Sequence, residues 1–135
     1  MSIRFRIVFT WMLRIIAAGI MLQTLYFKFS GAAESVYIFS QLGIEPWGRI
    51  GTGVMELIAS VLILFPGSTA IGAFLGLAIM TGAILSHIFK LGIEVQNDGG
   101  QLFIYALLTF FSSLALLVMY RNDVFRLARK IPFKL

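Results

Sequence analysis

Two charged residues, Glu56 and Arg14, lie inside long apolar stretches of the sequence. Glu56 belongs to the apolar stretch 54–65, and Arg14 interrupts the apolar stretch 7–22. A charged side chain inside a bilayer is costly, so it is usually paired or in contact with water, and it often marks a functional site. Chemically, these two residues suit an ion pair, proton transfer or the passage of a small molecule.

An ion pair between Arg14 and Glu56 is the simplest arrangement for both charges. At about 1.5 Å per helical residue, their backbones are expected at similar heights near the middle of the membrane. In the simplest case the pair is a static clamp between two helices. Alternatively, Glu56 is protonated, which burial favours, or it takes part in handling protons or a ligand.

A second group of polar side chains is expected near the outer membrane surface. It consists of Gln23, Lys28, Arg49 and His87. The forked guanidinium of Arg49 suits carbonyl or anionic oxygens, and the imidazole of His87 can take up and release a proton near neutral pH. We therefore predict that these four residues bind a ligand. The alternative is that the long side chains, Lys28 above all, only extend to the interface.

Several kinds of chemistry are excluded by the sequence. The chain has no cysteine and one histidine. A thiolate-ligated metal or iron–sulfur cluster is therefore excluded, as is a haem with paired histidine ligands. There is also no nucleophile motif, phosphate-binding loop or dinucleotide fingerprint. The sequence predicts no metal site and contains no complete catalytic constellation.

Membrane-spanning helices must position the charged residues. Of the 135 residues, 59% are hydrophobic, against ~45–50% in typical soluble domains. Four stretches approach the ~20 apolar residues that a membrane helix needs, at about 7–29, 47–65, 68–90 and 101–120. The first could instead be a secretory signal, although Arg14 and Lys28 argue against this. The prediction is one all-α membrane domain, a bundle of four transmembrane helices.

The distribution of charge predicts the orientation of the bundle. The two ends hold basic residues against the single carboxylate Asp123: Arg4, Arg6, Arg121, Arg126, Arg129, Lys130 and Lys134. The loops hold the carboxylates Glu34, Glu45, Glu94 and Asp98. Because basic segments stay in the cytoplasm, both termini are predicted there. The net charge of +5 thus reflects topology, and no nucleic-acid partner is predicted.

Two amphipathic segments are expected outside the spans. Residues 32–43 carry apolar side chains at helical spacing, which predicts a short helix on the outer surface between the first two spans. Residues 122–131 form a basic amphipathic tail. We expect Arg126, Arg129 and Lys130 to contact anionic lipids there, at ~1 kcal/mol per basic residue near the surface. A solvated tail is the alternative.

Each span has one polar or small face at helical spacing. Arg49, Glu56 and Ser60 share a face in the second span, and Tyr105, Thr109 and Ser112 share one in the fourth. The third span places Gly72 and Gly76 on the same face as Met80 and His87. Lipid offers such faces no partner, so they should meet inside the bundle. Ser60, Tyr105, Thr109 and Ser112 are the predicted polar core face.

The chain resembles the DoxX-like family of small four-helix membrane proteins. The resemblance runs from Arg14 to about Tyr120. It is carried by Arg14-Ile15-Ile16, Leu25-Tyr26-Phe27-Lys28-Phe29, Leu42-Gly43-Ile44-Glu45-Pro46, Gly53-Val54-Met55-Glu56-Leu57-Ile58-Ala59 and Gly82-Ala83-Ile84-Leu85-Ser86-His87. The resemblance implies the bacterial cytoplasmic membrane. Some members look like membrane subunits of quinone-linked sulfur oxidation, and others are tied to oxidative-stress complexes or methylamine utilisation.

Three functions follow as hypotheses. The first is an accessory membrane subunit of a redox system, which binds a quinone or lipid-like ligand near His87 and Arg49 and assembles with a partner oxidoreductase. The second is a transporter of small molecules or ions that uses Arg14 and Glu56. The third is a scaffold without a ligand. An apolar cavity beside His87 would favour the first, a polar path to Glu56 the second, and a tightly packed interior the third.

Overall fold

The computed structural model describes residues 2–130, and all of the regular secondary structure in these residues is helical. The elements are α1 (Ile3–Phe29), α2 (Ala33–Gln41), α3 (Trp47–Leu64), α4 (Thr69–Ser86), the π-helix η1 (His87–Leu91), α5 (Gln101–Met119) and α6 (Arg121–Lys130). No strand occurs in the described residues. The predicted all-α fold is therefore confirmed.

Four of the helical segments are long and apolar enough to cross a membrane: α1, α3, α4 with η1, and α5. Their bounds differ slightly from the predicted ones. The first helix begins at Ile3 rather than near residue 7, because the Ser2 hydroxyl accepts a hydrogen bond of 3.2 Å from the Phe5 N–H and caps it. The third span continues as a π-helix to Leu91.

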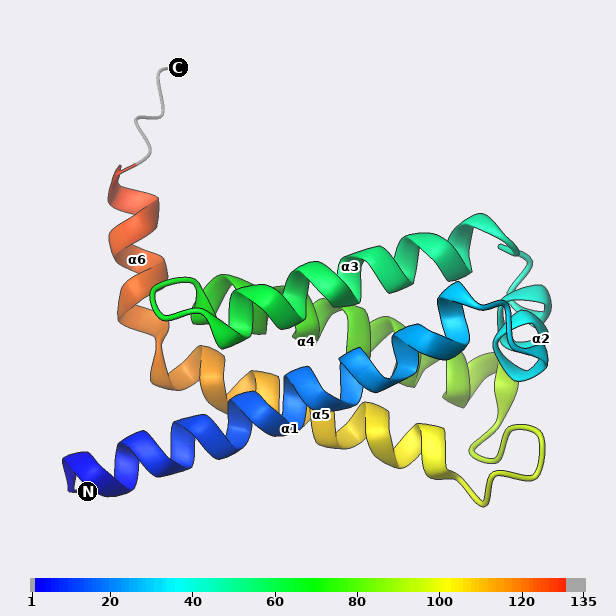
Figure 1. The fold of residues 1–135 in the computed structure, drawn as a ribbon, viewed down its shortest axis with the longest axis horizontal. Coiled ribbons are helices and arrows are strands. Elements are labelled where there is room, and N and C mark those ends of the chain that lie inside the picture. Colours follow the sequence, from blue (N-terminus) through cyan, green and yellow to red (C-terminus); the bar gives the residue numbers. More distant parts are fainter. Residues whose placement is uncertain (1, 131–135) are drawn as a thin grey trace.

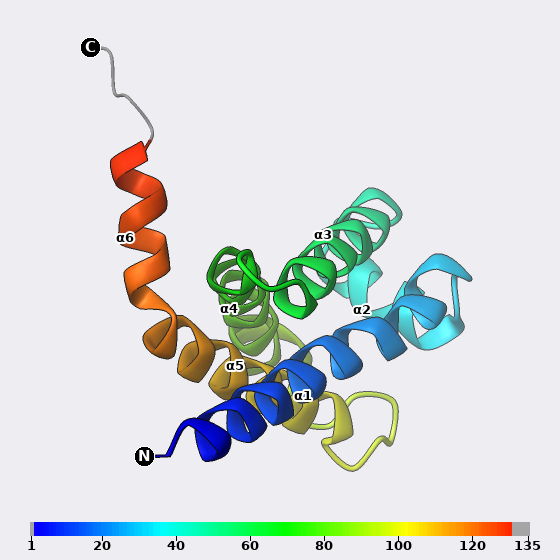
Figure 2. The ribbon, with the colours of Figure 1, turned by 60° about the vertical axis from the view of Figure 1, so that its left-hand side comes forward.

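The four spans lie side by side, and α2 lies across one end of the bundle (Figures 1 and 2). Helix α1 contacts α3 and α5, and α4 contacts the same two helices, so the spans form a ring. The start of α1 and all of α6 lie at the opposite end from α2 and the loop 92–100 (Figure 1). Each long helix is therefore antiparallel to the next one along the chain.

Small residues let the helices approach closely at the end away from α2. A Cβ atom on Gly72 would lie 2.6 Å from the Ile63 backbone nitrogen and 2.8 Å from the Ala59 carbonyl oxygen. One on Gly76 would lie 2.9 Å from the Ser113 hydroxyl oxygen. The two glycines therefore bring α4 against α3 and α5 respectively, as expected for small residues at membrane helix interfaces.

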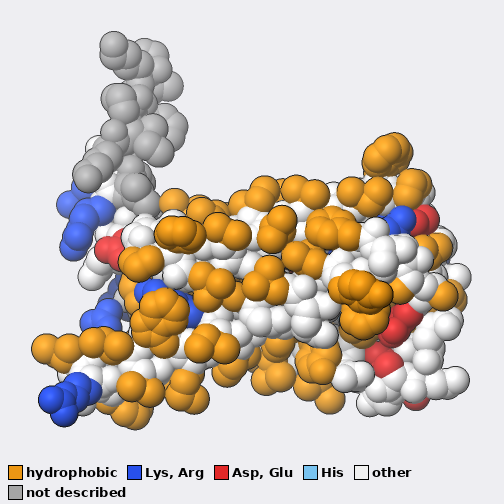
Figure 3. All heavy atoms as spheres, viewed as in Figure 1, with side chains coloured by type: hydrophobic (Ala, Val, Ile, Leu, Met, Phe, Trp, Pro, Cys, Tyr) orange, Lys and Arg blue, Asp and Glu red, His pale blue; other side chains and the backbone are white. Residues whose placement is uncertain are grey.

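The surface divides into an apolar middle and two charged ends. Hydrophobic side chains cover most of the visible middle, with blue basic side chains near α6 and the start of α1, and red acidic ones mostly at the other end (Figure 3). Helix α6 turns away from the bundle axis (Figure 1), and its Phe125, Arg126 and Arg129 are exposed. The predicted tail also included Ile131, which lies outside the described residues, as does the side chain of Lys130.

Candidate functional site

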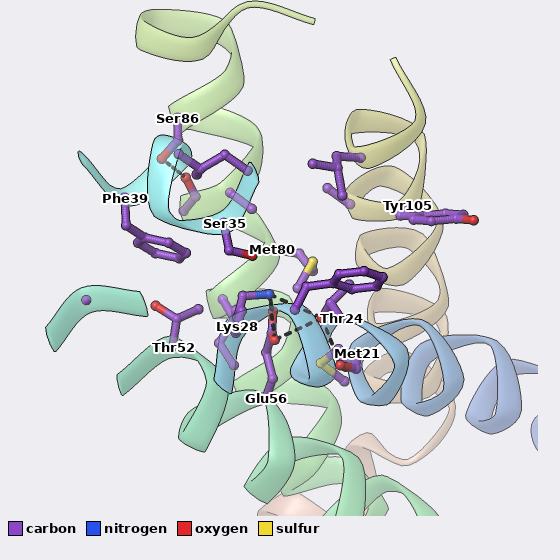
Figure 4. A pocket seen from close by; sticks show the side chains of 18 of the residues that line it. Met21, Thr24, Lys28, Ser35, Phe39, Thr52, Glu56, Met80, Ser86 and Tyr105 are labelled. Carbon is purple, nitrogen blue, oxygen red and sulfur yellow. Dashed lines mark hydrogen bonds and ion pairs between the residues drawn. The ribbon is translucent and has the colours of Figure 1, made fainter. Parts of the chain in front are cut away.

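A cavity of about 1000 Å³ lies in the half of the bundle beside α2. All four spans contribute to its wall, and α2 covers its end with Ser35 and Phe39 (Figure 4). Most of the lining is apolar. Its larger apolar side chains include Ile20, Phe27, Ile38, Phe39, Val54, Met55, Ile79 and Met80. The cavity therefore suits a largely apolar molecule.

Two glycines on the cavity wall leave space that a side chain would occupy. Gly51 of α3 and Gly82 of α4 both line it, and a Cβ atom on either glycine would meet no heavy atom within 4 Å. In the other half of the bundle, by contrast, Ile63 and Leu116 are completely buried. The bundle is thus open beside α2 and closed towards α6.

An ion pair between Lys28 and Glu56 lies on the cavity wall. Lys28 Nζ is 2.9 Å from Oε2 and 3.1 Å from Oε1 of Glu56. The hydroxyl of Thr24 accepts from Lys28 Nζ at 3.2 Å and lies 3.2 Å from Glu56 Oε2 (Figure 4). The two charged side chains are only 13% and 4% exposed. The pair places a buried, hydrogen-bonded polar group in an otherwise apolar cavity.

The predicted pair between Arg14 and Glu56 is wrong. Arg14 Nη2 donates to the Tyr120 hydroxyl at 2.7 Å, and the Arg14 guanidinium lies 4.6 Å from the centre of the Trp11 ring. Helical side chains lean towards the N-terminus of their own helix. In the antiparallel helices α1 and α3, Arg14 therefore leans away from α2, whereas Glu56 leans towards it. Lys28 leans from the end of α1 back into the bundle, where it meets Glu56.

His87 lies where α4 changes into η1, and it lines the cavity. Its Nδ1 is 2.9 Å from the Gly92 carbonyl oxygen, and its ring meets Phe103 edge-on, with 5.5 Å between centroids. A carbonyl oxygen only accepts hydrogen bonds, so Nδ1 carries a proton. In the neutral ring, Nε2 is then the acceptor. A π-helical turn is often found at functional sites.

The loop after η1 is ordered by Asp98. Its Oδ1 accepts from the N–H groups of Val95 at 3.0 Å and Gly100 at 2.8 Å, and Oδ2 accepts from Leu102 N–H at 3.1 Å. Burial raises the pKa of this carboxyl, but these three donors and the nearby His87 outweigh it and hold the pKa below its ordinary value. Asp98 thereby fixes the start of α5 beside the cavity.

Arg49 is not among the residues that line the cavity. Its Nε donates to Glu45 Oε1 at 2.9 Å, and its Nη1 donates to the Lys28 carbonyl oxygen. The guanidinium therefore joins the end of α1 to the segment before α3. Arg49 thus lies apart from the cavity, with its Nε and one Nη1 proton used in these two contacts, and its predicted part in ligand binding finds no support in the cavity lining. Gln23, Lys28 and His87, the other three predicted residues, do line the cavity.

The predicted polar core face is partly buried in the bundle. Ser60 and Thr109 are fully buried, and Ser112 is nearly so, whereas Tyr105 is half-buried and lines the cavity. The Ser60 hydroxyl donates to the Glu56 carbonyl oxygen at 2.7 Å. This bond stays within α3, and the buried Thr109 hydroxyl oxygen has no hydrogen-bond partner among the described residues.

The sequence prediction missed several polar groups of the cavity, among them Thr24, Ser35, Thr52 and Ser86. Thr24 had a usable signal, because it lies one helical turn before Lys28 and so shares its face. Ser35 had none, since the placement of α2 over the cavity depends on tertiary packing. Among the described residues, no group of three or more potential side-chain ligands for a metal ion comes together.

One of the comparisons with known proteins found a match. The family model of DoxX matches residues 9–88, which is more than half of the chain. The chain belongs to the DoxX family. No curated protein and no solved structure matches it. The part of the chain that matches the DoxX model includes Lys28, Glu56 and His87, so it holds most of the polar groups of the cavity.

Proposed function

We propose that this DoxX protein is an accessory membrane subunit of a redox system, and that it binds a quinone or a similar lipid-like ligand in the cavity beside α2. The cavity itself carries the proposal. It is large and mainly apolar, and its few polar groups converge from different helices. We further propose that the protein lies in the bacterial cytoplasmic membrane, with the cavity in the outer half of the bilayer.

The polar groups of the cavity suit a ligand with carbonyl oxygens. The ammonium group of Lys28 can donate to such an oxygen, because it has three protons that can be shared between Glu56, Thr24 and a ligand. His87 Nε2 can accept a proton from a ligand hydroxyl group and return it. Electrons would come from, or pass to, a partner oxidoreductase.

Binding of a quinone analogue tests the proposal. A decyl-substituted benzoquinone is titrated into the purified protein in mild detergent, and bound quinone is measured after equilibrium dialysis. Wild type should bind it, and both Glu56→Gln and His87→Phe should weaken binding about tenfold, since each removes a charged or proton-accepting partner. Lys28→Met should weaken it as well, whereas Lys90→Met should not, because Lys90 does not line the cavity. No binding to wild type would overturn the proposal.

A transporter is the second candidate, because the cavity reaches Glu56. Such a protein would have to open the closed half of the bundle, where Gly72 of α4 packs directly against the backbone of α3. Flux of a polar solute into proteoliposomes that is lost in Glu56→Gln would favour this candidate. Quinone binding without flux would favour the redox subunit.

A further inference from the structure

A second hollow lies on the lipid-facing side between α1 and α5. This groove has a volume of about 400 Å³, and Ile15, Gly19, Ile20 and Leu108 form its apolar part. Its polar residues are Gln23 and Tyr105. The groove is therefore almost wholly apolar except at the end that lies nearest α2.

The groove continues the cavity. Ile20, Gln23 and Tyr105 line both hollows, so the groove and the cavity adjoin each other between α1 and α5. From Gln23 the groove follows α1 towards Ile15, a length of about 12 Å at 1.5 Å per residue. Tyr105 is fixed at the junction, because its hydroxyl accepts from Gln101 Nε2 at 2.8 Å. The change from polar to apolar lining falls at this junction.

Gly19 keeps the groove open. A Cβ atom at this position would meet no heavy atom within 4 Å, so no close helix contact requires a glycine there. Glycine inside a helix costs about 1 kcal/mol relative to alanine. The missing side chain instead leaves space between α1 and α5 on the lipid-facing side.

We propose that this groove holds the first part of the hydrocarbon tail of the ligand whose head lies in the cavity. The inference rests on the proposed function, and it adds the class of ligand: an amphipathic molecule with a long apolar chain, which enters sideways from the bilayer between α1 and α5. An ordinary phospholipid fits less well. Its head group would stay at the membrane surface, whereas the end of the groove nearest α2 adjoins the cavity.

Filling the groove tests this inference. Gly19→Phe places a ring in the groove, and Thr81→Phe is the matched control, because Thr81 is exposed on α4 and lines neither hollow. Two probes are compared, the decyl-substituted benzoquinone and the same benzoquinone without its tail. Lipid chains are as apolar as the groove, so the tail gains only packing contacts and a fixed orientation when it leaves the lipid. We therefore expect Gly19→Phe to weaken binding of the decyl probe about fivefold. The tailless probe should bind both variants like wild type.

The outcomes separate the two proposals. Unchanged affinity of Gly19→Phe for the decyl probe, or an equal loss for both probes, would overturn the groove while the quinone site stands. Failure of both probes to bind wild type would overturn both.

A second measurement does not depend on a variant that folds. A photoreactive diazirine at the end of the decyl chain should label wild-type peptides that contain Ile15 or Leu108, and an excess of the unmodified probe should suppress this labelling. Suppressible labelling of α3 and α4 around Gly51 and Gly82 instead would show that the tail leaves on the other side, and would overturn the inference.

Discussion

At the scale of single residues, the Lys28–Glu56 pair combines a structural and a binding role. It joins α1 to α3 and is also the main polar group of the cavity. The two opposite charges compensate each other although both side chains are largely buried, whereas either charge alone would be buried and uncompensated. The pair therefore permits a polar binding group at a depth where a single charge would destabilise the fold.

A double-mutant cycle measures this coupling. Glu56→Gln leaves the ammonium of Lys28 buried, and Lys28→Met leaves the carboxylate of Glu56 buried. Each single change should cost about 3 kcal/mol of unfolding free energy, and the double change should cost less than either. Denaturant unfolding in detergent gives the values. The control is the cycle between Arg14→Met and Glu56→Gln, which should be additive, because these residues have different partners. Additive losses for Lys28 and Glu56 would contradict the structure.

Asp98 makes the stability of the fold depend on pH in the acid range. Its pKa is lowered in the folded protein, so its charge contributes stability that is fully present above its unfolded pKa of about 3.9 and is lost as pH falls through the folded pKa. Asp98→Asn should lower stability at pH 7 by about 1 kcal/mol, as expected for a weakened helix cap. Below about pH 4 the difference from wild type should shrink. Thermal unfolding at several pH values checks this, with Asp123→Asn as the control, because the Asp123 carboxylate lies 4.0 Å from Arg126 on α6, away from the loop that Asp98 orders.

The types of the site residues could be predicted from the sequence better than their partners. The depth of Glu56 and the positions of Lys28 and His87 on helical faces follow from residue spacing alone. The predicted partner of Glu56, Arg14, was wrong. The prediction compared the heights of the two backbones in the membrane and left out the direction in which helical side chains lean. That rule was available from the sequence. The contacts of Arg49 could not be predicted, because they depend on how α1 ends next to α3.

At the scale of helices, the contacts of two glycines on α4 differ sharply. Gly72→Ala would place a methyl group 2.6–2.8 Å from backbone atoms of α3, which cannot move aside cheaply. We expect a loss of about 1–3 kcal/mol, as for other overpacked sites. Gly82→Ala meets no atom within 4 Å, so it should be neutral or slightly stabilising. Unfolding of both variants in detergent compares them. Equal effects would contradict the close packing of α3 and α4.

Helix α6 is the element through which we propose contact with anionic lipid. It turns away from the bundle axis (Figure 1) and exposes Phe125, Arg126 and Arg129. In nanodiscs, phosphatidylglycerol should slow amide hydrogen exchange of residues 121–130. The double change Arg126→Gln with Arg129→Gln should remove most of this effect, since each basic residue contributes ~1 kcal/mol. Lys90→Gln, at the opposite end, is the control. Protection that is independent of lipid charge would contradict the proposal.

At the scale of the whole molecule, the ring of four helices is a consequence of polar and small faces that lipid cannot satisfy. The sequence predicts these faces and the spans, because hydrophobicity and helical period are local properties. The sequence does not predict the cavity. The cavity depends on where α2 lies and on the open space beside Gly51 and Gly82, and both are set by tertiary packing. The fold could therefore be predicted almost completely, whereas the shape of the site could not.

The orientation of the molecule in the membrane is the last prediction. Basic residues gather at the end that holds α6 and the start of α1, while the carboxylates of the loops gather at the end that holds α2 (Figure 3). Because basic segments are retained in the cytoplasm, α2 and the cavity should face outwards. The chain has no cysteine, so single cysteines report cleanly. In intact cells a membrane-impermeant maleimide should label Glu94→Cys, and should label Asn122→Cys only after permeabilisation. Ala59→Cys, which is fully buried, should react only after unfolding. Labelling of Asn122→Cys in intact cells would reverse the orientation, and with it the side of the membrane from which the cavity is reached.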